Sequence, residues 1–130
     1  MGVGRMASWN RTALIVEDQP FAGMVASDIL RETGFETFHA NNASGAMAML
    51  ESHPEIEVLV TDADLSGPGD GLELTRRVSA ERPHVQLVVT SGGRDLLALD
   101  MPDGARLLRK PYASAELRTL VGGIALLQDA

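Results

Sequence analysis

Short apolar runs alternate along the chain with longer stretches in which apolar residues recur every three or four positions. The short runs, most of them rich in Val, Leu or Ile, predict buried β-strands, and the longer stretches predict amphipathic α-helices. We expect the strands over residues 13–17, 35–39, 57–61, 85–89 and 105–108. Between and after them the pattern predicts five helices, the fourth of them short.

Capping and stop residues indicate where the helices begin and end. Pro20 suits the first turn of the first helix, Gly34 ends that helix, and Asn42 can cap the second. The later helices are expected over residues 72–82, 94–99 and 114–128. Gly122 and Gly123 fall inside the last one, where each glycine costs about 1 kcal/mol relative to alanine. Either a neighbour packs closely there or the end of that helix frays.

A regular alternation of strand and helix is typical of the α/β class, with a parallel sheet covered on both faces. Right-handed crossovers and short connections favour a doubly wound, five-stranded parallel sheet of the flavodoxin-like type, with strand order 2-1-3-4-5. In that order the first and third strands are neighbours. Residues that follow them would therefore lie side by side.

Composition and charge narrow the choice of function. The 130 residues include no cysteine, and no apolar run approaches the ~20 residues of a membrane span. We expect one cytoplasmic domain over residues 11–130, with a flexible arm at 1–10 and no membrane partner. The net charge of −7 and the scattered arginines argue against direct nucleic-acid binding. An acidic chain of this kind suits a divalent cation or a basic partner.

Reactive polar residues follow the apolar runs of four predicted strands. The carboxyl ends of parallel strands share one edge of the sheet, which is where ligands bind in folds of this type. Lys110, which follows the last strand, is the only lysine in the chain. The residues expected to meet at this edge are Glu17, Asp18, Asp62, Asp64, Thr90, Ser91 and Lys110.

These residue types suit cation binding and phosphoryl transfer. Clustered carboxylates repel one another unless a cation lies among them, and Mg²⁺ is held by one or two carboxylates together with phosphate oxygens. An aspartate can also accept a phosphoryl group. Asp62 would attack the phosphorus, while Mg²⁺, Lys110 and the Thr90 hydroxyl would each bind one phosphoryl oxygen. Taken singly, an acid at the end of a strand is more often a loop or helix-capping residue than part of such a site.

Five segments together resemble the receiver domain of bacterial two-component response regulators, and they match it in both order and spacing. They are Leu14-Ile15-Val16-Glu17-Asp18, Val60-Thr61-Asp62, Asp70-Gly71-Leu72-Glu73-Leu74, Val88-Val89-Thr90-Ser91-Gly92 and Arg109-Lys110-Pro111-Tyr112. The resemblance covers about residues 12–128. It implies phosphorelay signal transduction, in which a phosphorylated aspartate changes the conformation and thereby partner binding.

The resemblance also implies a role for each residue at the edge. Asp62 would be the phosphorylation site and would form the catalytic set with Thr90 and Lys110. The Mg²⁺ ligands would be Glu17, Asp18, Asp62 and the backbone carbonyl of Asp64, with Asp18 the more direct ligand of the acid pair. The phosphoryl donor would be a phosphohistidine of a sensor histidine kinase or a histidine phosphotransfer protein. The chain would catalyse only its own phosphorylation and dephosphorylation, so it would not be an enzyme for other substrates.

The sequence departs from the family pattern at Leu107, three residues before Lys110. The family usually has an aromatic residue there, which rotates when the switch hydroxyl moves. Thr90 cannot act through such a ring in this chain, so switching would use another element, such as the Gly92-Gly93 loop. The face between the fourth and fifth helices would be where partners read the state, and two copies could pair through it.

Two other protein classes share parts of the pattern. Asp62-Ala63-Asp64 resembles the nucleophile motif of haloacid-dehalogenase-type phosphatases, although that motif usually follows the first strand and a further acidic motif should follow Lys110. Glu17 with the later Asp62-Ala63-Asp64-Leu65-Ser66-Gly67 resembles a toprim module, which binds nucleic acid with Mg²⁺ but gives Thr90 and Lys110 no role. A receiver-like module that is never phosphorylated also stays compatible with the sequence.

Overall fold

The computed structural model describes residues 11–65, 67, 70–92 and 100–129, with side chains described as far as residue 124. The expected arm at residues 1–10 and the expected helix at 94–99 lie outside these ranges. The elements are β1 (Arg11–Val16), α2 (Pro20–Glu32), β2 (Phe35–Ala40), α3 (Ala43–Ser52), β3 (Val58–Asp62), α4 (Asp70–Glu81), β4 (Gln86–Ser91), β5 (Arg106–Arg109) and α5 (Ser114–Asp129).

The five strands form one sheet of order β2-β1-β3-β4-β5, and every neighbouring pair is parallel. This confirms the predicted α/β fold class and strand order. Strands β1 and β3 lie side by side in the middle of the sheet, with Val16 paired to Thr61. Their carboxyl ends therefore open at the same place on the edge.

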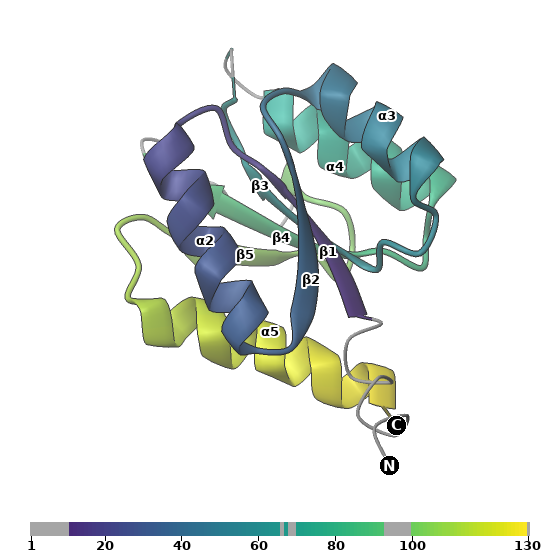
Figure 1. The fold of residues 1–130 in the computed structure, drawn as a ribbon. Helices are drawn as coiled ribbons and strands as arrows, with labels where there is room; N and C mark the ends of the chain where they lie inside the picture. Colours follow the sequence, from purple (N-terminus) through teal and green to yellow (C-terminus); the bar gives the residue numbers. More distant parts are fainter. Residues whose placement is uncertain (1–10, 66, 68–69, 93–99, 130) are drawn as a thin grey trace.

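Helices cover both faces of the sheet (Figure 1). Helices α2 and α5 pack on one face, in a core that includes Ile15, Val60 and Leu117. Helices α3 and α4 pack on the other face, in a core that includes Leu14 and Leu59. The alternation of successive strand residues between two buried faces explains why the central strands are almost continuously apolar.

Four strands extend one or two residues further toward their carboxyl ends than the apolar pattern predicts. Strand β3 ends at Asp62 instead of residue 61, and β4 ends at Ser91 instead of residue 89. Strands β2 and β5 likewise extend to Ala40 and Arg109. Pairing persists past the apolar core because backbone hydrogen bonds, not side-chain burial, define a strand. The polar residues of the edge are thus part of the sheet or adjoin it directly.

The other boundaries differ little from the expected ones. Strand β1 ends at Val16, one residue before the predicted end at Glu17, although the Glu17 N–H still donates to the Ala40 carbonyl at 3.0 Å. Helix α4 begins at Asp70, before the first apolar residue of its stripe. Asp70 and Glu73 occupy its first turn, where negative charge is favourable.

Turn and cap residues behave as the sequence indicates. Gly34 has a φ of 95° directly after α2, and the Asn42 side chain accepts a hydrogen bond from the Gly45 N–H at 2.7 Å at the start of α3. A Cβ added to Gly122 would lie 4.0 Å from Thr33 Cγ2, which is an ordinary contact. A Cβ added to Gly123 would meet nothing within 4 Å. Close packing therefore does not explain the second glycine.

Gly123→Ala is expected to raise the free energy of unfolding by about 1 kcal/mol, because the methyl group meets open space and alanine favours the helix. Urea unfolding of the two proteins measures the difference. As a matched control, Gly34→Ala should lower the free energy of unfolding by about 1–2 kcal/mol, since alanine is strained at positive φ. Equal stability of all three proteins would contradict this account of α5.

Among the described residues, no helix is both long enough and apolar enough to cross a bilayer.

Candidate functional site

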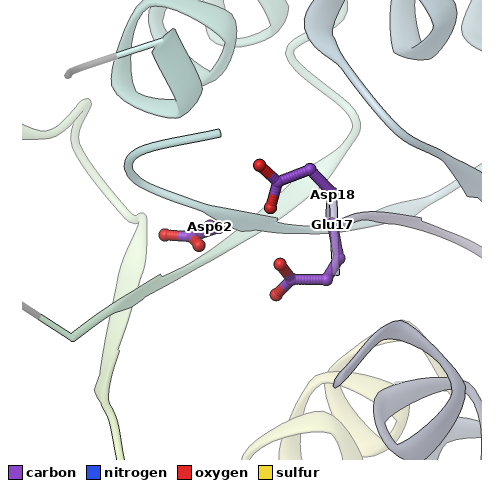
Figure 2. Close-up of side chains that lie close together, drawn as sticks. All are labelled: Glu17, Asp18 and Asp62. Atoms are coloured by element: carbon purple, nitrogen blue, oxygen red, sulfur yellow. The ribbon is translucent and has the colours of Figure 1, made fainter. Parts of the chain in front are cut away.

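Three carboxyl groups converge at the carboxyl edge of the sheet. Glu17 and Asp18 follow β1, Asp62 ends β3, and one carboxylate oxygen of each lies within 4.8 Å of the others. From consecutive positions, the Glu17 and Asp18 side chains leave the backbone in opposite directions, beside Asp62 (Figure 2). The structure thus brings together three of the acids that the sequence singles out.

Backbone hydrogen bonds hold two of these carboxylates in place. Asp62 Oδ1 accepts from the Asp64 N–H at 3.0 Å, and Glu17 Oε2 accepts from the Gln19 N–H at 3.3 Å. Glu17 is buried, whereas Asp18 is exposed. Asp62 and Glu17 therefore have fixed directions, and Asp18 presents its carboxylate to solvent.

The turn between β3 and α4 approaches Asp62 closely through Gly71. The Gly71 N–H donates to the Ala63 carbonyl at 2.8 Å. A Cβ at Gly71 would collide with the Asp62 carbonyl oxygen and would lie 2.7 Å from the Asp62 carbonyl carbon. Only glycine allows α4 to begin this close to the end of β3.

Lys110, which directly follows the outer strand β5, contacts two of the acids. Its Nζ lies 3.2 Å from Asp62 Oδ2 and 3.3 Å from Glu17 Oε1. Burial lowers the pKa of Lys110, but the charge of Glu17 and the hydrogen bond and charge of Asp62 together outweigh it, so the pKa lies above the usual 10.5. Lys110 is therefore a fixed ammonium at neutral pH.

The raised pKa of Lys110 predicts a pH dependence of stability. Its contribution is fully present below the unfolded-state pKa of 10.5 and is lost as pH rises through the higher folded-state pKa. In urea unfolding without divalent cations, the stability difference between wild type and Lys110→Met should therefore change in slope above pH 10.5. Arg118→Met, which removes an exposed pair with Glu32, should give a difference that does not vary over that range. A pH-independent difference for Lys110→Met would contradict the assignment.

Thr90 and Asp64 flank Asp62. Thr90 is paired to Asp62 across β3 and β4, and it is 4% exposed. Residues directly opposite in a parallel pair direct their side chains to the same face, so the Thr90 hydroxyl lies on the Asp62 side of the sheet. Asp64 reaches the site through its backbone N–H.

The departure at Leu107 has a packing explanation. Leu107 is half-buried against a small cluster of Ala63, Leu72 and Val89. A Cβ added to Gly92, in the loop after β4, would make an ordinary contact of 3.5 Å with the Lys110 side chain. Tyr112 packs against the α2–α5 core, and burial raises the pKa of its phenol. Lys110 itself is bonded to the end of β4, since its N–H donates to the Ser91 carbonyl at 2.8 Å.

The charges of the site do not balance. The three carboxylates carry three negative charges, and Lys110 supplies one positive charge beside them, which leaves a net charge of −2. Carboxylate oxygens at this spacing match the ligand preference of a hard divalent cation such as Mg²⁺. The donor set therefore fits one divalent cation, whose two positive charges would balance this excess.

Comparison with known proteins agrees with this geometry. The sequence model of the response regulator receiver domain matches residues 13–122, which is most of the chain. This chain belongs to the response regulator receiver family. It is thereby a receiver domain of two-component signalling, with a kinase or a phosphotransfer protein as the implied kind of partner.

The individual proteins that match this chain have low sequence identity to it. The sporulation initiation phosphotransferase F of Bacillus subtilis (strain 168) is 26% identical over 117 residues, which are 86% of this chain and 91% of that protein. The receiver domain of NtrX from Brucella abortus is 27% identical, with a TM-score of 0.75 over 88% of this chain and 97% of that one. A receiver domain from Clostridium thermocellum, at 21% identity, shares the fold with a TM-score of 0.81 over 92% and 97% of the two chains.

Proposed function

We propose that this receiver domain accepts a phosphoryl group on Asp62 with the help of Mg²⁺ and relays it as a change in partner binding. The observation that carries the proposal is the position of Asp62, which lies among two further acids and against the only lysine of the chain. The match to a phosphotransferase of a sporulation pathway supports a phosphorelay.

The transfer needs little covalent chemistry from the protein. A carboxylate oxygen of Asp62 attacks the phosphorus, the phosphorus–nitrogen bond of the donor phosphohistidine breaks, and the imidazole leaves with the bonding electron pair. Lys110, already 3.2 Å from Asp62 Oδ2, can bind an oxygen of the arriving group. The hydroxyl of Thr90 would bind a second oxygen, since Thr90 is paired to Asp62 in the sheet.

The metal would be held by the carboxylates of Asp18, Glu17 and Asp62 and by the backbone carbonyl of Asp64. When bound, Mg²⁺ neutralises charge on the acids and on the phosphoryl oxygens. Glu17 also bonds Lys110, so it can orient the ammonium and the metal site together. The same side chains would serve the return reaction with water, which removes the phosphoryl group from Asp62.

The change of state would start at Lys110 and Thr90. A phosphoryl group adds a charge of about −1.5 to −2 and can form new charge-assisted hydrogen bonds with both side chains. The Lys110 N–H donates to the Ser91 carbonyl at 2.8 Å, so a shift of Lys110 would be passed to the end of β4. This route does not require an aromatic residue at Leu107. We also propose that two copies can pair through the face between the expected helix at residues 94–99 and α5.

An apolar surface beside the acids suits the phosphoryl donor. Phe21 is 74% exposed and Met24 is 56% exposed, and both lie on the first turns of α2, directly after Glu17 and Asp18. Residues three apart share one helix face. We propose that this pair contacts the protein that carries the phosphohistidine.

Phe21→Ser should slow phosphoryl transfer from a protein donor by about tenfold, the effect of losing an anchor worth about 1.4 kcal/mol. The measurement is the transfer rate from a kinase or phosphotransfer protein that phosphorylates the wild-type chain. Phosphorylation by acetyl phosphate serves as the control, and its rate should not change. Equal slowing with both donors would show that Phe21 supports the fold instead of the contact.

The proposed function is tested by incubating the chain with acetyl phosphate and Mg²⁺, and with a protein phosphodonor, and then weighing the intact protein. One labile phosphoryl adduct should appear and should require the divalent ion. Absence of an adduct with every donor would favour the unphosphorylated binding module. Sustained release of phosphate from a phosphate monoester would favour the phosphatase, although Asp62 lies on the third strand in the chain and not on the first.

A further inference from the structure

His39 contacts the backbone of the acid pair from the neighbouring strand. Its Nε2 lies 3.1 Å from the carbonyl oxygen of Glu17. A carbonyl oxygen only accepts hydrogen bonds, so Nε2 must carry the proton and donate it. The imidazole belongs to β2 and reaches across the carboxyl end of β1, where the first residues of the candidate metal site begin.

Helix α2 leaves room for this ring at Gly23. A Cβ at Gly23 would lie 2.8 Å from His39 Nε2 and 3.3 Å from His39 Cδ2. Gly23 is a buried residue inside α2, where glycine is otherwise unfavourable relative to alanine by about 1 kcal/mol. Gly23 therefore makes α2 less stable than alanine would, but it allows His39 to lie close to the turn after β1.

Within the described residues, no backbone N–H of the turn donates to this carbonyl. Gln19 uses its N–H on the Glu17 side chain, and Pro20, the first residue of α2, has no N–H. The backbone of Glu17 is thus held on both sides, with its N–H donating to the Ala40 carbonyl and its carbonyl oxygen accepting from the His39 ring.

Fixing the Glu17 carbonyl also fixes the start of Asp18. The carbonyl of one residue and the N–H and Cα of the next lie in one rigid plane. Asp18 is exposed, so packing does little to direct its side chain. Its direction toward Glu17 and Asp62 therefore depends on the orientation of the peptide that His39 holds.

We propose that His39 is a positioning residue of the metal site, which orients the Glu17–Asp18 peptide so that the Asp18 carboxylate meets those of Glu17 and Asp62. Gly23 is its structural counterpart, because it admits the imidazole. The inference rests on the proposed function, since it assumes that these acids bind Mg²⁺.

The test measures Mg²⁺ binding by the metal-free full chain, with calorimetry and with the amide resonances of Glu17 and Asp18. His39→Ala should weaken Mg²⁺ binding by about tenfold, the lower end of the effect of groups that orient metal ligands. It should also shift the Asp18 amide before any metal is added. His39→Gln places an amide N–H where Nε2 lies, so it should restore binding to within a small factor of wild type.

Gly23→Ala provides an independent arm. Its methyl group should displace the ring and weaken Mg²⁺ binding, because the displaced imidazole no longer reaches the Glu17 carbonyl. In the His39→Ala background the same change should have no effect on Mg²⁺ affinity, because there is no ring to displace. A loss of affinity that disappears in the His39→Ala background cannot come from general loosening of the fold.

The outcomes distinguish the positioning role of His39 from the existence of the metal site. If His39→Ala binds Mg²⁺ as tightly as wild type, or if His39→Gln is as weak as His39→Ala, the positioning role is overturned and the proposed function stands. If the wild-type chain binds no Mg²⁺, the metal site itself is overturned and the role of His39 with it.

Discussion

Asp62→Asn is expected to abolish the phosphoryl adduct that acetyl phosphate and Mg²⁺ form on the wild-type chain. The amide is nearly the same size as the carboxylate but is not a nucleophile at neutral pH. Its oxygen can still accept from the Asp64 N–H, so the turn after β3 should stay in place. Intact-protein mass spectrometry gives the adduct, and urea unfolding shows that the variant folds.

Asp64→Asn is the matched control for this prediction. In the receiver mechanism Asp64 acts through its backbone, so the adduct should still form. In a phosphatase of the haloacid-dehalogenase type, the second aspartate would be needed as an acid, and its loss would stop turnover. An adduct that persists in Asp62→Asn would place the phosphoryl group on another residue and would overturn the assignment.

Gly71→Ala is expected to have the largest effect on the fold. The added Cβ would collide with the Asp62 carbonyl oxygen and would lie 2.9 Å from the carbonyl carbon of Ala63. These are backbone atoms in the middle of the sheet edge, so no flexible side chain can move aside. Such overpacking typically costs about 1–3 kcal/mol, and here we expect at least the upper value.

The same change should also impair the site, because separating α4 from β3 moves the residue that carries the acceptor carboxylate. Urea unfolding and the acetyl phosphate adduct measure the two effects. Gly123→Ala is the control, since it adds the same methyl group where nothing lies within 4 Å and should leave the adduct unchanged. Wild-type stability for Gly71→Ala would show that the turn after β3 is not tightly packed.

Much of the fold can be predicted from the chain because buried strands and amphipathic helices differ in period. The order of the elements along the chain and the fold class follow from the alternation of strands and helices. Strand ends are less predictable, because the apolar pattern stops where burial stops. Asp62 and Ser91 are the last residues of their strands, although neither is apolar. The backbone ladder continues there, as in the bond from the Lys110 N–H to the Ser91 carbonyl at 2.8 Å.

The candidate site is predictable to the extent that it depends on strand order. Neighbouring parallel strands bring Glu17, Asp18 and Asp62 together, and the structure places Lys110 against two of them. The contact between His39 and Glu17 could not be predicted in this way. The partner of His39 is a backbone atom next to another strand, and a backbone atom carries no signal in residue type.

The contact between Lys110 and Glu17 joins positions 93 residues apart. A chain emerging from the ribosome carries both acids of β1 and the acceptor on β3 well before the strand that delivers the ammonium. In the proposed function Lys110 binds an oxygen of the arriving phosphoryl group, so the site would be complete only after β5 has joined the sheet. A nascent chain with β1 and β3 but without β5 would therefore be a poor phosphoryl acceptor.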